Sequence, residues 1–126
     1  MKYISMNEFL MGRAKLEDLS NELCWNANVT VTRANELLEA FGKYRKVNSG
    51  YRRPSDNVAA GGAPKSKHMS CQAVDLSDPD GKLHKFCKEN PQLLETIGFW
   101  CEERQGGWQH LQIVPPKSKK RWFFHN

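Results

Sequence analysis

Apolar residues in the first third of the chain recur at helical spacing and predict three helices. Residues 5–8, Ser-Met-Asn-Glu, have the spacing of a capping box, and the apolar residues after them predict a short first helix. Residues 15–25 carry leucines on one helical stripe and predict a second helix. We expect the polar segment 26–32 to interrupt it. A third helix over 33–42 then ends at a glycine.

Beyond this point the pattern changes to short alternating runs, which predict strands. Residues 43–51 predict a strand that stops at the Ser49-Gly50 pair, and residues 71–76 predict a second one. In residues 98–114, aromatic and β-branched residues flank a Gly-Gly pair, which indicates a β-hairpin. We expect two helices before the hairpin, over 82–89 and 91–97, and an edge strand formed by the aromatic residues of the C-terminal tail.

The segment 52–67 is rich in glycine, proline, serine and alanine and has no periodic pattern. We expect a long loop there, and loops of this length in small domains are usually functional or disordered. The layout as a whole predicts an α+β fold. N-terminal helices would pack on a small, mostly antiparallel sheet.

Composition narrows the possible partners. The net charge of +5 favours a polyanion, which could be nucleic acid, a membrane surface or an anionic cell wall. The chain has no apolar run of about 18–20 residues that could span a membrane. The N-terminus does not resemble a secretory signal. The scattered cysteines have no metal or redox spacing, so we expect buried free thiols at Cys24, Cys71, Cys87 and Cys101.

Two histidines and an aspartate are the candidates for a metal site. His68 lies in a polar loop, and Asp75 follows seven residues later in the apolar run. Because strand side chains alternate between faces, both can face one point only if the chain bends between them. His110 lies on the second arm of the hairpin, and it can join them if that arm pairs with residues 71–76. Two imidazoles and one carboxylate, with a fourth position open, suit a catalytic zinc ion.

Each of these residues has a simpler interpretation when it is taken alone. His68 is typical of a solvated loop histidine, Asp75 of a strand-end or capping carboxylate, and His110 of a hairpin side chain. No metal-binding role is expected for His84 or His125.

Three ordered motifs between residues 47 and 114 resemble those of the zinc peptidoglycan peptidases. This group includes bacterial D-alanyl-D-alanine carboxypeptidases and dipeptidases, and phage endolysins that cut the L-alanyl–D-glutamate bond. Residues 66–75 match the motif Ser-x-His-x-x-Gly-x-Ala-x-Asp, with Cys71 in place of the glycine. Residues 108–110 match Trp-x-His, and residues 49–52 match a preceding Ser-Gly-Tyr-Arg motif.

The resemblance implies the small α+β zinc-peptidase fold shared with the hedgehog signalling domain. It implies one Zn²⁺ per chain, held by His68, Asp75 and His110. The positions expected to contact substrate are Arg52, Ser66 and Trp108, and the arginine also stabilises the transition state. We therefore expect a single zinc peptidase domain over 1–126, with helical support (1–43), a metal-site core (44–114) and a basic, aromatic tail (115–126).

The chain differs from many of these peptidases at the position of the general base. Many relatives carry a catalytic glutamate three residues before the last histidine, but Gly107 occupies that position here. Glu102 and Glu103 lie on the first arm of the hairpin, where cross-strand geometry could bring one of them near the metal. The stretch "GFWCE" resembles a segment of some phage relatives, which favours Glu102 and leaves Glu103 as the reserve.

These features predict a zinc metallopeptidase that hydrolyses peptidoglycan stem peptides, either as a D,D-carboxypeptidase or as an L-Ala-D-Glu endopeptidase. We expect a monomeric phage-type endolysin that is made in the cytoplasm without a signal peptide. It would act at the cell wall after release through a holin, and anionic wall polymers are possible further partners. One alternative is a non-catalytic zinc-binding virion or wall-binding module of the same fold. Another takes residues 115–124 as a nucleic-acid-binding patch, but it leaves the metal candidates unexplained, so no nucleic acid is expected.

Overall fold

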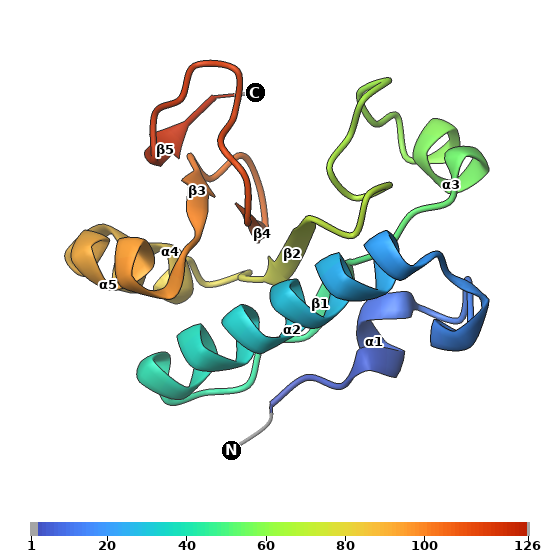
Figure 1. Ribbon diagram of the computed structural model, residues 1–126. Coiled ribbons are helices and arrows are strands. Elements are labelled where there is room, and N and C mark those ends of the chain that lie inside the picture. Colours follow the sequence, from blue (N-terminus) through green and yellow to red (C-terminus); the bar gives the residue numbers. More distant parts are fainter. Residues whose placement is uncertain (1–2, 126) are drawn as a thin grey trace.

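The computed structural model describes residues 3–125 and confirms an α+β fold, in which helices pack on a five-stranded mixed sheet (Figure 1). The strands lie in the order β1-β2-β4-β3-β5, and all neighbours are antiparallel except β3 and β5, which are parallel. Their bounds are β1 Val47–Ser49, β2 Ala73–Ser77, β3 Trp100–Glu102, β4 Trp108–Gln112 and β5 Trp122–Phe124.

The first helix forms as its sequence predicts. Helix α1 spans Met6–Leu10, and Ser5 and Glu8 make both hydrogen bonds of a capping box. A 3₁₀ turn, η1, follows at Leu16–Asp18. The helices after β2 also agree with prediction, since α4 spans Lys82–Glu89 and α5 spans Pro91–Ile97.

The expected break at residues 26–32 is wrong, because one continuous helix, α2, spans Asn21–Phe41. Its buried stripe includes Ala27, Val31 and Ala34, so helical spacing continues through the polar segment. The buried hydroxyl of Thr30 donates a hydrogen bond to the carbonyl of Cys71 at 2.7 Å. Tertiary packing therefore outweighs the modest helix propensity of the asparagine, valine and threonine residues.

The segment 52–67 is not a featureless loop, because it contains helix α3, Pro54–Ala59. Proline occupies the first turn, where its missing N–H costs nothing. The backbone N–H of Arg53 donates to the Asp56 carboxylate at 3.0 Å. The start signal was therefore present in the sequence, but the helix is too short to show apolar periodicity.

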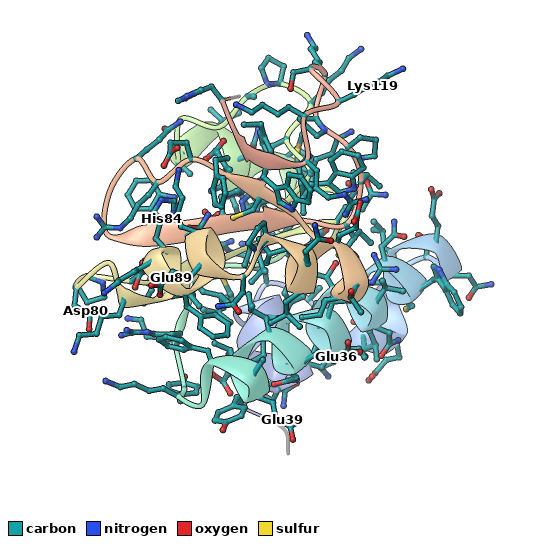
Figure 2. The ribbon with its side chains drawn as sticks, turned by 90° about the vertical axis from the view of Figure 1, so that its left-hand side faces the viewer. Glu36, Glu39, Asp80, His84, Glu89 and Lys119 are labelled. Carbon is teal, nitrogen blue, oxygen red and sulfur yellow. The ribbon has the colours of Figure 1, made fainter. Side chains whose placement is uncertain are left out.

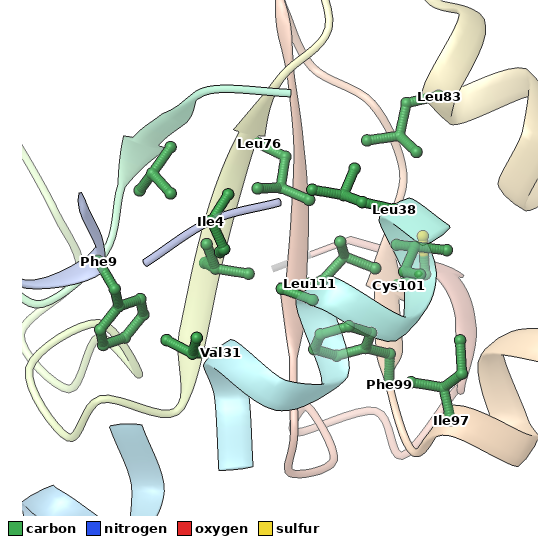
Figure 3. Packing of buried hydrophobic residues seen from close by; sticks show 14 of the residues in the cluster. Ile4, Phe9, Val31, Leu38, Leu76, Leu83, Ile97, Phe99, Cys101 and Leu111 are labelled. Carbon is green, nitrogen blue, oxygen red and sulfur yellow. The ribbon is translucent and has the colours of Figure 1, made fainter. Parts of the chain in front are cut away.

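The two faces of the sheet have different neighbours. Val74 and Leu76 of β2 and Leu111 of β4 belong to the apolar core together with residues of the helices (Figure 3). Because side chains alternate along a strand, Asp75 and His110 lie on the other face. Helices α1, α2, α4 and α5 therefore supply support from one side, and the candidate site lies on the opposite side of the sheet.

The C-terminal tail agrees with prediction, and the cysteines agree except in the burial of Cys24. Strand β5 pairs with β3 at the edge of the sheet. All four cysteines are free thiols; Cys24 is half-buried, and the other three are buried. Within residues 3–125, no helix is both long and apolar enough to cross a membrane.

Candidate active site

Neighbouring strands bring polar residues into one row on the open face of the sheet. Asp75 of β2 lies opposite His110 of β4 and also opposite Ser49 of β1. On the other side of β4, the partners Trp100–Gln112 and Cys101–Leu111 set the register of β3. Continuing that register by one residue places Glu102 opposite His110. Each of Asp75, His110 and Glu102 is less than one-tenth exposed, so the row is shielded from bulk water.

His68 reaches this row from the turn before β2. Its side chain is 3% exposed, so the interpretation of a solvated loop histidine is wrong. The ring Nδ1 lies 2.9 Å from the carbonyl oxygen of Gly50, which can only accept a hydrogen bond. Nδ1 therefore donates a hydrogen bond to that carbonyl, which directs Nε2 toward the cluster, 3.3 Å from Asp75 Oδ2.

His110 is oriented in the same manner with its nitrogens exchanged. Its Nε2 lies 2.8 Å from Gln112 Oε1, and its Nδ1 lies 2.7 Å from Asp75 Oδ1. Burial lowers the pKa of His110, but the hydrogen bond and charge of Asp75 outweigh it, and the pKa is raised overall. Burial likewise raises the pKa of Asp75, but its hydrogen bonds to His110 and His68 leave that pKa below its usual range.

The donor set fits a zinc ion. One ligand atom from each of His68, Asp75 and His110 lies within 4.8 Å of the other two. Two imidazole nitrogens and a carboxylate form a donor set of catalytic zinc sites. The second nitrogen of each ring has an acceptor, Gly50 or Gln112, and such partners commonly orient metal-binding histidines. The residues thus offer Nε2 of His68 and Nδ1 of His110 as nitrogen ligands.

The two hairpin glutamates face different surroundings. Glu102 lies in the row beside His110, whereas the carboxylate of Glu103 accepts a hydrogen bond from Lys88 at 2.8 Å. Glu103 also lies 2.9 Å from His84 Nε2. The hydrogen bond from Lys88 is the main reason why the pKa of Glu103 is lowered. The structure therefore brings Glu102 beside His110 of the candidate ligand set and holds Glu103 among residues of α4.

Arg52 lies beside the same cluster. Its Nη2 is 3.8 Å from Asp75 Oδ2, its Nε donates to Ser49 Oγ at 3.0 Å, and its Nη1 donates to Asn57 Oδ1 at 3.2 Å. The guanidinium is thus held from two sides with one end toward the candidate metal site. A fixed cation at this position can bind a substrate carbonyl or carboxylate.

The other two expected substrate contacts differ from each other. Ser66 accepts a hydrogen bond from the backbone N–H of His68 at 3.2 Å, so its hydroxyl supports the metal-binding turn. Trp108 lies on the same strand face as His110 and is 37% exposed, which leaves its ring accessible to a ligand.

Cys71 occupies the position where the motif has glycine. Its φ of 60° lies in the left-handed region that favours glycine. The cysteine is fully buried, and its side chain belongs to the apolar core. The backbone conformation expected of the motif is therefore kept although the residue differs.

Sequence reasoning missed the residues that support the cluster. Asn57 is among them, and no periodic signal pointed to it. Gln112 could have been found, because strand alternation places it on the same face as His110. His84, to which no metal-binding role was assigned, contacts Glu103 and Gln109 on the helix-covered face of the sheet.

Comparison with known proteins agrees with this geometry. The family model described as Peptidase M15 matches residues 4–111, which is most of the chain. No curated protein gives a significant match. The matched range contains the His68–Asp75–His110 cluster, whose donor set suits the zinc ion on which these peptidases depend. The chain belongs to the Peptidase M15 family of zinc-dependent peptidases.

Proposed function

We propose that the protein hydrolyses amide bonds in the stem peptides of peptidoglycan, with one zinc ion held by His68, Asp75 and His110. The observation that carries this proposal is the row of buried polar side chains on the open face of the sheet. It combines a three-residue ligand set with a carboxylate and a nearby guanidinium. Those are the groups that hydrolysis of an amide requires.

The bound zinc ion would supply a Lewis acid that polarises the substrate carbonyl and lowers the pKa of water. The remaining chemistry belongs to Glu102 and Arg52. Glu102 accepts a proton from the attacking water and then returns it to the amine that leaves when the C–N bond breaks. Arg52 binds the substrate carbonyl or carboxylate and stabilises the negative charge that develops on oxygen.

Glu102 suits the role of base better than Glu103. The register of β3 and β4, continued by one residue, and the contribution of the Glu102 charge to the raised pKa of His110 both support a position beside the proposed ligands. Glu103 already has Lys88 and His84 as partners, and its lowered pKa makes it a weaker base. Trp108 would contribute an exposed ring to substrate binding, while Ser66 would act through the backbone of His68.

We further propose that the protein is a phage-type endolysin that reaches the cell wall after release from the cytoplasm. The exposed lysines of the tail support binding to anionic wall polymers. They are Lys117, Lys119 and Lys120, and Figure 2 shows Lys119 projecting outward. Lysines near a polyanion increase the rate of encounter, and salt weakens this effect.

The test is digestion of purified bacterial cell walls by the zinc-loaded protein, followed by mass spectrometry of the released fragments. Fragments with a new C-terminal L-alanine or a new N-terminal D-glutamate would identify an endopeptidase, and free D-alanine would identify a carboxypeptidase. Activity should disappear with a chelator and return with zinc. If the zinc-loaded protein releases no fragment from any wall, the proposed hydrolysis is wrong, and a non-catalytic zinc module becomes the better interpretation.

A further inference from the structure

The turn after α3 approaches the guanidinium of Arg52 more closely than a side chain would permit. A β-carbon at Gly62 would lie 2.0 Å from Asn57 Oδ1 and 2.8 Å from Arg52 Nη1. Both distances are far below van der Waals contact. The position must therefore lack a side chain if the hydrogen-bonded pair of Asn57 and Arg52 is to stay in place.

Asn57 is itself fixed and almost completely buried, with 4% exposure. Its Nδ2 donates to the carbonyl of Ala63 at 2.8 Å, and its own carbonyl accepts from the N–H of Gly62 at 2.9 Å. These bonds leave the side-chain oxygen directed at Arg52 Nη1. Helix α3 and the glycine turn thus form one unit around the arginine.

This unit determines which donors of Arg52 remain available. Ser49 takes the Nε–H, and Asn57 takes one N–H of Nη1. A guanidinium has five N–H donors, so three remain, and Nη2 lies 3.8 Å from Asp75. The two N–H donors of Nη2 are therefore held on the side that faces the candidate metal site.

We propose that Asn57 and Gly62 are positioning residues, which hold Arg52 in the orientation that binds the substrate oxygen. This inference rests on the proposed function for its catalytic consequence. An arginine held in advance loses less conformational freedom when substrate binds, and a displacement of about 1 Å can cost on the order of 10²-fold in rate.

The first test compares two adjacent glycines. In Gly62→Ala, the new methyl group meets the ends of two side chains rather than backbone, so the fold can survive while Arg52 moves. We expect zinc content to stay at one per chain and kcat/KM on wall peptides to fall by about 10–10²-fold. Gly61→Ala is the matched control, because its φ of 68° makes alanine strained but its β-carbon meets no atom within 4 Å. It should lower the Tm but change kcat/KM by no more than about twofold.

A double-mutant cycle separates positioning from a general loss of structure. Arg52→Ala should itself lower kcat/KM by roughly 10²-fold. If Gly62 acts through Arg52, adding Gly62→Ala to that variant causes no further loss. Fully additive losses would overturn the proposal.

NMR detection of the Arg52 Nε–H in the full zinc-loaded chain provides a readout that does not depend on catalysis. Its resonance, assigned by its loss in Arg52→Ala, should shift or broaden in Gly62→Ala and in Asn57→Ala but not in Gly61→Ala. An unchanged resonance in Gly62→Ala refutes the positioning role. If the resonance responds as expected while wild type cleaves no wall, the positioning of Arg52 stands and the proposed hydrolysis fails.

Discussion

A glutamate, a glutamine and a histidine meet on each face of the hairpin of β3 and β4, but in different surroundings, and on one face the histidine comes from α4. The open face has Glu102, His110 and Gln112, and the helix-covered face has Glu103, Gln109 and, from α4, His84. On the open face, the histidine lies beside a second histidine and an aspartate.

On the covered face, a lysine and an aromatic ring surround the corresponding groups. Lys88 Nζ lies 2.8 Å from Glu103 Oε2 and 4.0 Å from the ring centroid of Phe123, and the ring of His84 packs edge-on against Phe123. Here the carboxylate of Glu103 is balanced by the positive charge of Lys88. On the open face, the carboxylate of Asp75 is shared by two imidazoles that a metal could bind. The neighbours, and not the residue types, separate a candidate metal site from a structural network.

The largest expected difference is between the two histidines. His68→Ala removes a zinc ligand, so zinc content should fall from one per chain to near zero, and wall hydrolysis should fall to background. His84→Ala removes a histidine from the covered face, and we expect it to retain one zinc. This variant should lower the free energy of unfolding by about 1–3 kcal/mol, because the buried side-chain oxygen of Gln109 loses its hydrogen-bond partner. Metal analysis of both purified variants checks this, and full zinc occupancy in His68→Ala would contradict the ligand assignment.

The two glutamates should differ next most strongly. Glu102→Gln keeps the size of the side chain but removes its basicity, so hydrolysis should fall by about 10²–10⁴-fold with zinc retained. Glu103→Gln should stay within a few-fold of wild type, since its partners are Lys88 and His84. Rates on the same wall preparation give the comparison. If both variants stay active, the base lies elsewhere.

Variants of the two glutamines distinguish orientation of the His110 ring from stability of the β3–β4 pairing. Gln112→Leu removes the acceptor for His110 Nε2, and we expect zinc affinity to fall by about 10–100-fold. Gln109 is fully buried, and its amide donates to the carbonyls of Glu102 and His110 at 2.7 and 3.1 Å. Gln109→Leu should therefore lower the free energy of unfolding of the metal-free protein by about 1–3 kcal/mol. Zinc titration and urea unfolding of both variants distinguish the effects, and equal zinc affinity in Gln112→Leu and wild type would remove Gln112 from the site.

The smallest effect concerns the ion pair on the covered face. Lys88→Met removes the hydrogen bond that lowers the pKa of Glu103, so that pKa should rise toward its ordinary value in an NMR titration. A carboxylate with a lowered folded-state pKa adds stability above its unfolded pKa, near 4.3, and loses it as pH falls through the folded value. Wild type should therefore exceed Lys88→Met in stability at pH 7 by at most about 1 kcal/mol, because both side chains are about one-third exposed or more. The difference in stability between the two proteins should disappear at acidic pH. A difference that increases there would exclude the lowered pKa of Glu103 as its cause.

The sequence predicted the three proposed metal ligands because spacing and residue chemistry both pointed to them. The pairing of β2 with β4 was also foreseeable, since both strands alternate and one of them belongs to a hairpin. The continuous helix α2 was not, because its polar and β-branched segment has weak local preference and is helical through packing on the core. The residues that hold Arg52 could not be predicted either, because their arrangement depends on the close approach of Gly62 to Asn57, which no local sequence pattern encodes.

The cysteine at the glycine position of the motif has a consequence for the redox tolerance of the protein. Cys71 lies only three residues after His68, and thiolates bind zinc strongly. Burial raises the pKa of its thiol to about 12, so it stays protonated in the core and does not compete for metal or react readily with oxidants. We therefore expect the proposed ligand set to stay the same in reducing and in oxidising surroundings.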